Sequence, residues 1–434
     1  MPWRERRQVK LKSYWLDTAP PFSAGAQGPP EGDADVAIVG AGFTGLSAAL
    51  ALAKKGAKVV VLEAGLVANA ASGRNGGMCN NGFAQDYYSL ATKLGRERAN
   101  MIYRAFDAGV DKVEAIILEE GIDCHFKRVG KLKLAAKPEH YDKLARSQAL
   151  LAAEVDPETR MVPRSELRAE IGSDRYFGGL VFEKGSGMHM GKYGQGLAEA
   201  AARRGALIHE NNPVIGIRRL SGQAHELRTP TGSVRARQVL LATGTSAVGP
   251  LGWFRRRIVP VGAFIIATAP LPVTLLDKLT PRRRNTTDSK NLVNYFRVSP
   301  DDRLLFGGRA RFTSSTDPES DRKSGAILRH ALVEVFPELA DVRIDYCWGG
   351  IVDMTRDRLP RAGEHEGLFY SMGYSGHGTH MATYMGAIMA EVLDGKANLN
   401  PWRDFDWPAI PGHFGKPWFL PIVGAWYRYQ DLVR

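Results

Sequence analysis

The chain has 434 residues, of which 44% are hydrophobic and 24% are charged, and this composition excludes a disordered or collagen-like protein. One simple core does not accommodate such a length, so we expect two closely joined domains. The formal net charge of +12 fits a solvated face, and because no RNA-recognition signature or zinc finger accompanies it, nucleic acid is not expected as a partner.

The sequence shows no secretory or membrane-spanning pattern. The N-terminal stretch MPWRERRQVKLKSYW is basic but lacks the apolar segment of a secretory signal, and no run reaches the roughly 18 apolar residues that a membrane span needs. The cysteines Cys79, Cys124 and Cys347 are odd in number and widely spaced, which is typical of reduced thiols. We therefore expect a cytoplasmic protein, and the basic N-terminus and aromatic C-terminal tail leave peripheral membrane contact open.

The chain begins with an irregular lead-in and continues with a βαβ unit. Residues 1–33 contain a Pro- and Gly-rich stretch that favours no regular structure. The apolar run DVAIVG (35–40) predicts a buried parallel strand, a helix follows and stops at Gly56, and KVVVLE (58–63) predicts a second buried strand. Strand, helix and strand together have the length of a βαβ unit.

Helical and strand patterns alternate over the rest of the chain. Residues 88–160 are mainly helical in pattern, and a further helix covers 193–206. Strand patterns follow over 206–244, and the strand-rich stretch 257–312 predicts an antiparallel sheet. Near the end, a strand leads into a helix over Thr379–Leu393, and a tail dense in aromatics and prolines is expected to cap the fold.

The turn between the first strand and the first helix carries a GxGxxG motif, GAGFTG. Gly40 permits the tight turn, Gly42 lets the backbone approach a pyrophosphate, and Gly45 lets helix and strand pack closely. The helix N-terminus then offers free N–H groups to a diphosphate. Glu63 ends the next strand, where a carboxylate accepts hydrogen bonds from a ribose and repels a 2′-phosphate. The stretch therefore predicts dinucleotide binding and disfavours NADP.

A second glycine-rich turn, ASGRNGG (71–77), helps to decide between NAD and FAD. FAD is the longer cofactor, and its ring lies far from its adenine, so loops from elsewhere in the chain must reach it. The glycines of this turn allow backbone N–H groups to approach a planar ring. Ser72, Arg74 and Asn75 supply polar contacts to a phosphate or a ring edge. The turn favours FAD, because a nicotinamide enzyme has no evident need for it.

Two later segments fit the same cofactor. The strand in LLATGTSA ends at Ala242, Thr243 and Gly244, and upstream of it Val214 begins a strand where an adenine could be covered. In GYSGHGTHM a glycine loop opens the helix at Thr379, which aims a helix N-terminus at an anion. A reduced flavin carries negative charge at its pyrimidine edge, so this loop is suited to lie beneath it.

Together these segments predict FAD as the cofactor. The predicted cofactor-binding residues are Gly40, Ala41, Gly42, Phe43, Thr44, Gly45, Glu63, Ala64, Ser72, Gly73, Arg74, Asn75, Gly76, Gly77, Met78, Val214, Ala242, Thr243, Gly244, Gly376, His377, Gly378 and Thr379.

The order of the motifs resembles the D-amino-acid oxidase superfamily of FAD-dependent oxidoreductases, and within it the γ-glutamylputrescine oxidase-like branch. The similar segments are SYWLDTAP, GAGFTG, ASGRNGG, LLATG, LLFGGR, TRDRLPRAG and GYSGHG, and they cover nearly the whole chain. The resemblance implies a two-domain fold, a buried and extended FAD, and oxidation of a C–N bond in an amine or amino acid.

Two departures from the family pattern concern the flavin and the substrate. Some relatives attach the flavin through a cysteine seven residues before an aspartate, but here Asp357 has Gly350 at that position, and Cys347 lies three residues too early. The prediction of non-covalent FAD rests on this difference. Met78 stands where related chains often carry Gln, so substrate specificity does not transfer by analogy.

The expected reaction is hydride transfer from the substrate C–H to flavin N5, followed by hydrolysis of the imine, with O2 or another acceptor taking the electrons. This chemistry requires no essential acid–base residue. His377, Arg309 and Tyr295 are the catalytic candidates, His377 as a flavin contact or as a residue that stiffens its loop, and Arg309 as a clamp for a carboxylate or as a structural arginine. No metal site is predicted, because His377 and His380 lack companion ligands.

Two other functions remain as alternatives. The net charge of +12 motivates an RNA-modifying flavoprotein. The basic N-terminus and aromatic tail motivate a membrane-associated dehydrogenase that passes electrons to a quinone. The sequence predicts neither the particular amine nor the oligomeric state.

The predicted fold class is α/β, with a Rossmann-like FAD-binding domain and a second α+β substrate domain built on an antiparallel sheet. The predicted organisation is 1–33 as lead-in, 34–90, 165–250 and 345–400 as a discontinuous FAD-binding domain, 91–164 and 251–344 as substrate domain, and 401–434 as aromatic tail.

Overall fold

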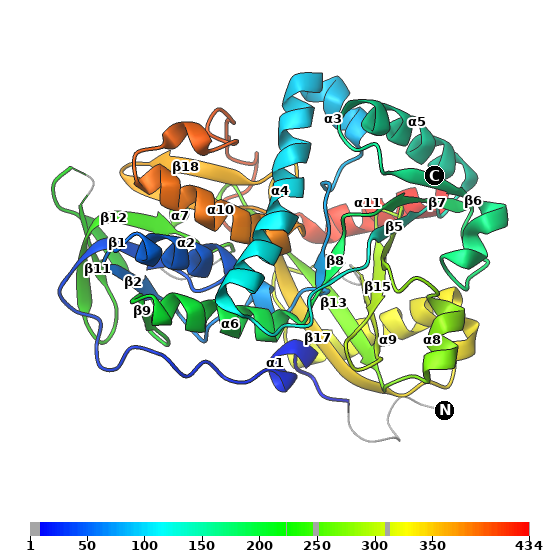
Figure 1. Cartoon of the computed structure of the whole chain (residues 1–434), viewed down its shortest axis with the longest axis horizontal. Coiled ribbons are helices and arrows are strands. Elements are labelled where there is room, and N and C mark those ends of the chain that lie inside the picture. The colour runs from blue at the N-terminus through cyan, green and yellow to red at the C-terminus, as the bar shows by residue number, and fades with distance from the viewer. Residues whose placement is uncertain (1–8, 223, 246–250, 309–312, 434) are drawn as a thin grey trace.

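The computed structural model describes residues 9–222, 224–245, 251–308 and 313–433, and within them the strands form three sheets (Figure 1). The helices are α1 (Tyr14–Thr18), α2 (Phe43–Lys54), α3 (Tyr87–Leu94), α4 (Arg96–Glu120), α5 (Pro138–Glu154), α6 (Met190–Arg203), α7 (Gly252–Arg255), α8 (Val273–Leu279), α9 (Pro318–Val335), α10 (Gly378–Leu393) and α11 (Leu420–Val433). The 3-10 turns are η1 (Ala71–Gly73), η2 (Arg164–Ala169), η3 (Pro337–Leu339) and η4 (Ala397–Leu399).

The strands are β1 (Asp33–Val39), β2 (Val59–Leu62), β3 (Met78–Cys79), β4 (Lys127–Arg128), β5 (Lys131–Leu134), β6 (Arg160–Pro163), β7 (Gly178–Phe182), β8 (Ser186–Gly187), β9 (Leu207–His209), β10 (Gly216–Arg219), β11 (His225–Arg228), β12 (Ser233–Leu241), β13 (Val259–Thr268), β14 (Asn285–Asp288), β15 (Asn294–Val298), β16 (Leu304–Gly308), β17 (Ile344–Met354), β18 (Arg361–His365) and β19 (Leu368–Met372).

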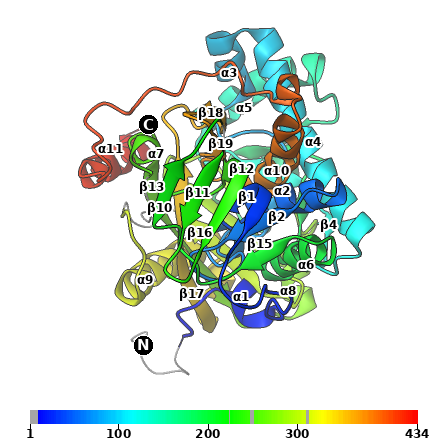
Figure 2. The ribbon, with the colours of Figure 1, turned by 90° about the vertical axis from the view of Figure 1, so that its left-hand side faces the viewer.

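The first sheet is the Rossmann-like layer. Its strands lie in the order β10-β11-β12-β1-β2-β9, and β19 and β18 add beside β12; the strands from β10 to β2 are seen in Figure 2. β1 pairs in parallel with both β2 and β12. The central strands are buried on both faces, which explains why β2 is the continuous apolar run VVVL. α2 packs between α6 and α10 over one face (Figure 1).

The second sheet lies beside the first and follows the order β17-β13-β16-β15-β14-β5-β7-β6. All its pairs are antiparallel except the parallel pair of β5 and β14. One face carries an apolar core that includes Leu132, Phe296 and Phe306, and residues of α8 and α9 complete this core. The short strands β3, β8 and β4 form the third sheet. The predicted α/β class with a largely antiparallel second sheet is confirmed.

Several boundaries differ from the sequence prediction. The stretch 88–160 is mainly helical as predicted, through α3, α4 and α5, but the short strands β4 and β5 interrupt it and β6 begins at its last residue. β7 and most of β17 fall in segments predicted for the FAD-binding domain, but both strands pair within the second sheet. Val214 precedes β10 and does not begin it. In each case strand pairing with distant residues decides the outcome, and local sequence pattern does not reveal such pairing.

The C-terminal tail is partly packed and partly exposed. Trp402 and Trp407 are buried, whereas Trp418 and Trp426 are 65% and 56% exposed. Only the first part of the tail therefore covers the core as predicted. α11 is held at its end by Asp431, whose carboxylate accepts hydrogen bonds from the backbone N–H groups of Asn291 and Leu292, each at 2.8 Å.

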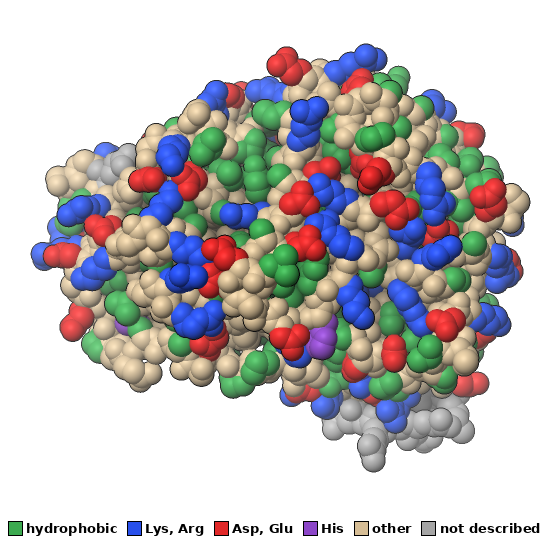
Figure 3. Space-filling view, in the orientation of Figure 1, with side chains coloured by type: hydrophobic (Ala, Val, Ile, Leu, Met, Phe, Trp, Pro, Cys, Tyr) green, Lys and Arg blue, Asp and Glu red, His purple; other side chains and the backbone are tan. Residues whose placement is uncertain are grey.

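The surface carries mixed charges. On the face shown in Figure 3, Lys and Arg side chains are interspersed with Asp and Glu, as the prediction of a solvated face requires. In the part of the chain that the structure describes, no helix combines the length and apolar character of a membrane span.

Candidate functional site

A cavity of about 1240 Å³ is lined by residues from both large sheets and from α10. Successive contacts between lining residues can be followed along its wall. The turn at Gly40 contacts the end of β12, Gly42 lies beside Ser72, and Gly350 lies beside Arg74. Beyond Arg74, the wall continues across the second sheet to β5. We call the part around Gly40, Glu63 and Ala242–Gly244 the glycine end, and the part around Lys131, Lys133, Thr287 and Asp288 the lysine end.

The glycine end contains the GxGxxG turn. Gly40 has φ +106°, and a Cβ there would lie 2.7 Å from the carbonyl oxygen of Ala242. A Cβ on Gly45 would lie 1.9 Å from the carbonyl oxygen of Gly40, so α2 packs on the turn only with glycine at this position. α2 has no side-chain cap of its own, and the backbone N–H of Phe43 donates to Ser72 Oγ at 3.1 Å. The N-terminus of α2 thus faces the cavity, and side chains of its own first turn do not accept hydrogen bonds from its free backbone N–H groups.

Glu63 and Thr243 add polar atoms to this end. The Glu63 carboxylate accepts from the backbone N–H of Ala41 at 2.7 Å and from that of Gly65 at 2.8 Å. Each carboxylate oxygen has a further lone pair, so both can accept from a ligand hydroxyl. Thr243 Oγ1 is buried and has no hydrogen-bond partner among the described residues. A buried hydroxyl without a partner in a cavity wall indicates a position for a polar ligand atom.

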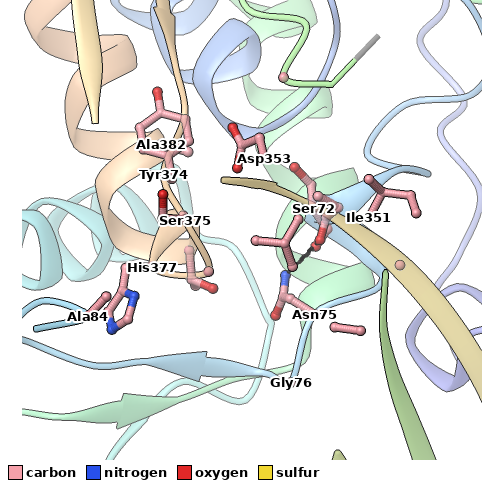
Figure 4. Close-up of a pocket in the computed structure, with 18 of the residues that line it drawn as sticks. Ser72, Asn75, Gly76, Ala84, Ile351, Asp353, Tyr374, Ser375, His377 and Ala382 are labelled. Carbon is pink, nitrogen blue, oxygen red and sulfur yellow. Dashed lines mark hydrogen bonds between the residues drawn. The ribbon is translucent and has the colours of Figure 1, made fainter. Parts of the chain in front are cut away.

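The loop after η1 takes its shape from its own side chains. Arg74 Nε donates to the carbonyl of Asn69 at 2.9 Å, and Asn75 Nδ2 donates to that of Ser72 at 2.8 Å, the bond drawn in Figure 4. Asn75 Oδ1 also accepts from the N–H of Gly77 at 2.9 Å. Arg74 and Asn75 line the cavity, but these bonds go to backbone and fix the loop.

Arg297 supports the same loop from behind, and sequence analysis missed it. Its Nη1 donates to the carbonyls of Gly77 and Met188, the second at 3.2 Å. Burial lowers the pKa of the Arg297 guanidinium to about 10. The alternating pattern of strand β15 would have placed it on a sheet face, but not in contact with a loop more than 200 residues earlier in the chain.

Across the cavity lies the segment that leads into α10 (Figure 4). Ser375 has φ +54° and Gly376 has φ +88°. His377 stands at the N-cap without a side-chain cap hydrogen bond, and Gly378 and Thr379 line the cavity, so the uncapped N-terminus of α10 faces it. The ring of His377 lies edge-on to Phe106, with 6.3 Å between ring centroids.

Asp353 at the end of β17 holds this segment and was also missed. Its Oδ2 accepts from the backbone N–H of Gly373 at 2.7 Å, and its backbone carbonyl accepts from the N–H of Ser375 at 3.1 Å. Burial raises the pKa of the Asp353 carboxyl to about 6, against the effect of the backbone hydrogen bonds. Nothing in the local sequence marks Asp353, because its importance depends on its hydrogen bonds to Gly373 and Ser375 beyond the next two strands.

His380 faces the cavity in a neutral form. Burial lowers the pKa of its imidazole well below the ordinary value, and neither ring nitrogen has a hydrogen-bond partner in the described ranges. It lies edge-on to Phe106, with ring centroids 5.5 Å apart. No group of three or more metal-binding side chains exists among the residues described, so His377 and His380 find no third ligand there.

Tyr295 lies on β15 of the second sheet, and its ring faces the loop at Gly76. A Cβ on Gly76 would come within 2.9 Å of the Tyr295 ring, and one on Gly307 within 2.4 Å. Both glycines therefore make room for this aromatic side chain. Met78 also lines the cavity. The third catalytic candidate, Arg309, lies outside the described residues.

Gly350 and Cys347, the two positions relevant to covalent attachment of the flavin, have different surroundings. Gly350 lines the cavity, where a Cβ would lie 3.2 Å from Arg74 Cβ. Cys347 is fully buried away from the cavity lining, and its thiol donates to the carbonyl of Asp321 at 3.1 Å. Burial raises the pKa of the Cys347 thiol to about 12, so it is a thiol and not a nucleophilic thiolate at neutral pH.

A family model described as FAD dependent oxidoreductase (DAO) matches residues 35–392. The chain belongs to this family. It is 34% identical to the probable oxidoreductase OrdL of Haemophilus influenzae, with 98% of this chain and 99% of that protein covered. It is 32% identical to the gamma-glutamylputrescine oxidoreductase of Escherichia coli, with 92% of each chain covered. The superfamily and branch that the motifs indicate are confirmed.

A solved structure extends the comparison to the fold. The crystal structure of glycine oxidase from Geobacillus kaustophilus matches with a TM-score of 0.68 and 25% identity, over 84% of this chain and 96% of that one. The protein is thus an FAD-dependent oxidoreductase. Its cavity fits the cofactor on three observations: glycines where a Cβ would collide, the unpartnered Thr243 hydroxyl, and the uncapped N-termini of α2 and α10 at one cavity.

Proposed function

We propose that this FAD-dependent oxidoreductase oxidises a C–N bond in an amine or amino acid. The observation that carries the proposal is the continuity of the cavity, which joins the glycine end to a chamber with charged walls at the lysine end. A cofactor that extends from the first end therefore has room beside it for a small polar substrate. The names of the relatives, which include a glycine oxidase and a gamma-glutamylputrescine oxidoreductase, support the same substrate class.

The proposed cofactor contacts follow the chain of neighbouring residues along the wall. Glu63 is assigned to the adenosine ribose, and the N-terminus of α2 with Ser72 is assigned to the diphosphate. The loop 74–78 is assigned to the flavin ring, and the uncapped N-terminus of α10 to its pyrimidine edge. Arg74 and Asn75 act through the shape of the loop, since their hydrogen bonds go to backbone.

When bound, FAD supplies the acceptor for a hydride from the substrate C–H next to nitrogen. The chain itself orients the substrate and excludes water. The amine must be neutral to lose hydride, and a desolvated chamber favours the neutral amine. The substrate also loses a proton, and water then hydrolyses the resulting imine to a carbonyl compound and a free amine. We assign His377 the role of stiffening the α10 loop and Tyr295 that of a chamber wall; Arg309 keeps its proposed role as carboxylate clamp.

Anaerobic mixing of the FAD-loaded protein with amines, N-methyl amino acids and γ-glutamyl amines tests the proposed function. We expect at least one of them to bleach the flavin absorbance. If no member of the panel reduced the flavin while dithionite did, C–N oxidation would be wrong.

FAD is proposed to be held without a covalent bond, because Gly350 occupies the position of the attachment cysteine and Cys347 is buried elsewhere. Acid precipitation should release all of the yellow colour into the supernatant. Flavin that remained with the precipitated chain would refute this assignment.

The exposed aromatic side chains of the tail favour a second candidate for the electron acceptor. Trp418, Ile422 and Trp426 are each more than half exposed, and such residues are typical of a membrane interface. A membrane-associated dehydrogenase that reduces a quinone would use them. Peroxide formed in stoichiometric amount during amine turnover in air would support O2 as acceptor, whereas rapid quinone reduction without peroxide would support the second candidate.

A further inference from the structure

The strand β5 places two lysines at the cavity. Its sequence KLKL alternates, and because successive side chains of a strand point to opposite faces, Lys131 and Lys133 share one face. Leu132 and Leu134 belong to the apolar core on the other face. Both lysines line the cavity, and Lys131 is only 7% exposed. A buried ammonium group is unfavourable without a compensating charge.

Neither lysine forms a direct ion pair with a carboxylate of the described residues, although Asp86 acts on the charge of Lys133 from a greater distance. No ion pair there includes the ammonium of either lysine; Lys131 Nζ donates to the carbonyl of Asn81 at 3.4 Å and lies 4.5 Å from the centre of the Phe182 ring. The neighbouring carboxylates are engaged elsewhere. Asp86 accepts from Ser89 and pairs with Lys143 at 3.4 Å.

Asp288 is engaged in the same way. Its two carboxylate oxygens accept from the backbone N–H and the side-chain amide of Asn294, at 3.0 and 2.9 Å. Its burial raises the pKa of the Asp288 carboxyl to about 6. The lysine end therefore holds two lysines whose amino groups have no direct carboxylate partner in the described ranges.

The sheet register connects these lysines to the predicted flavin position. Lys133 pairs with Thr287, and Thr287 pairs with Tyr295 on the next strand. All three line the cavity. Since neighbouring strands lie about 4.8 Å apart, Lys133 and Tyr295 are roughly 10 Å apart along this row. Tyr295 contacts Gly76 in the loop assigned to the flavin ring.

We propose that Lys131 and Lys133 form a subsite for a carboxylate of the substrate, separated from the oxidised nitrogen by a chain of several atoms. The inference deepens the proposed function and rests on it for the identity of the ligand as a substrate. The substrate class is thus an amine that carries a remote carboxylate. Buried ammonium groups bind carboxylates through charge-assisted hydrogen bonds, which are the stronger kind.

The subsite has a defined dependence on pH. Burial, and then the charge of Lys133, lower the pKa of the Lys131 ammonium to about 7. Burial also lowers the pKa of Lys133, with Lys143 and Arg358 acting in the same direction and Asp86 against it. His380 faces Lys131 in its neutral form. A bound carboxylate favours the charged lysine, so binding at pH 8 takes up a proton and weakens as the pH rises through 7.

Calorimetric titration of the FAD-loaded protein with hexanoate, which carries a carboxylate and cannot be oxidised as an amine, tests the subsite. Hexanamide is the neutral control ligand. We expect hexanoate to bind at least tenfold more tightly than hexanamide, with proton uptake at pH 8 seen as a buffer-dependent enthalpy. Lys131→Met and Lys133→Met should each weaken hexanoate binding about tenfold or more. Lys112→Met, at an exposed position on α4, should leave it unchanged.

Equal binding of the acid and the amide, or unchanged hexanoate binding in both cavity variants with FAD content intact, would overturn the subsite. Displacement of hexanoate by inorganic phosphate at comparable concentration would reveal a general anion site and would also overturn the carboxylate assignment. The titration needs no turnover. If hexanoate binds as expected but no amine reduces the flavin, the proposed function fails and the anion subsite stands; the opposite pattern removes only the subsite.

Discussion

At the glycine end the cavity wall is mainly backbone, whereas at the lysine end it is charged side chains carried by strands. Gly40 and Gly45 admit no Cβ because carbonyl oxygens lie within 2.7 and 1.9 Å of it. Lys131 and Lys133 project from a strand whose backbone makes regular sheet pairs. A wall made of backbone suits a cofactor that stays the same, whereas side chains on a strand can be substituted without altering the fold and so suit substrates that differ. The comparison leads us to propose that the first end determines cofactor retention and the second determines substrate choice.

The largest expected effect is at the glycine end. Gly45→Val places a branched side chain against the Gly40 carbonyl, and overpacking of this kind costs about 1–3 kcal/mol or more. We expect loss of FAD from the purified protein, measured as flavin absorbance per chain. Gly56→Ala is the matched control, since Gly56 has φ +81° but nothing within 4 Å of a Cβ, and it should lower stability by about 1 kcal/mol with FAD retained. Full FAD content in Gly45→Val would contradict the proposal that the glycine end retains the cofactor.

Asp353, between the two ends, gives a prediction about pH. Its folded pKa of about 6 is above the value of about 4 for an unfolded aspartate, so its contribution to stability is full below pH 4 and is lost as the pH rises through 6. Asn keeps an oxygen that accepts from Gly373 and removes the charge. Asp353→Asn should therefore raise the free energy of unfolding at pH 8 by about 2 kcal/mol and leave it nearly unchanged at pH 4.

Chemical denaturation at both pH values measures this effect. Asp394→Asn, at a side chain that is 54% exposed, should show no such difference. A loss of stability in Asp353→Asn at pH 8 would mean that the loop before α10 needs the ionised carboxylate.

A smaller effect is expected at Glu63. Its two oxygens each accept from a backbone N–H group, and in Glu63→Gln one of them becomes an NH2 group that cannot accept. We expect the Kd for FAD to rise about tenfold, followed by flavin fluorescence on titration of the apoprotein. Glu119→Gln, whose side chain is 59% exposed, serves as control. Unchanged FAD affinity would remove Glu63 from the cofactor contacts.

The smallest effect on the cofactor is expected at Tyr295. Tyr295→Phe keeps the ring that fills the space over Gly76 and Gly307, so the Kd for FAD should stay within about twofold. Loss of the hydroxyl should lower kcat/KM about fivefold for the amine that reduces the flavin. A large loss of FAD with unchanged kcat/KM would reverse the roles assigned to the two ends.

The glycine end was predictable because its signals are local. GAGFTG, the apolar strands around it and Glu63 lie within one βαβ unit, where a few residues fix the backbone path. The α10 loop was also predictable, since GYSGHG must turn before a helix, and the helix begins at Gly378, one residue before the predicted position.

The lysine end was not predictable in the same way. KLKL indicates a strand with a polar face, and the usual interpretation of such a face is exposure to water. Lys131 is buried because β14, about 150 residues later, pairs with β5, and because the loop at Asn81 contacts its amino group. Asp353 and Arg297 escaped notice for the same reason, since each contacts a segment far away in the chain.

By itself the sequence determined the dinucleotide-binding unit and the α/β class, because glycine spacing and apolar runs act on neighbouring residues, and the order of its motifs carried the resemblance to the FAD family. Only the tertiary structure decided which charges are buried, which side chains fix the loop 74–77, and where the cavity continues beyond that loop. Those outcomes depend on the pairing of strands remote in the chain, and a local pattern carries no information about the partner.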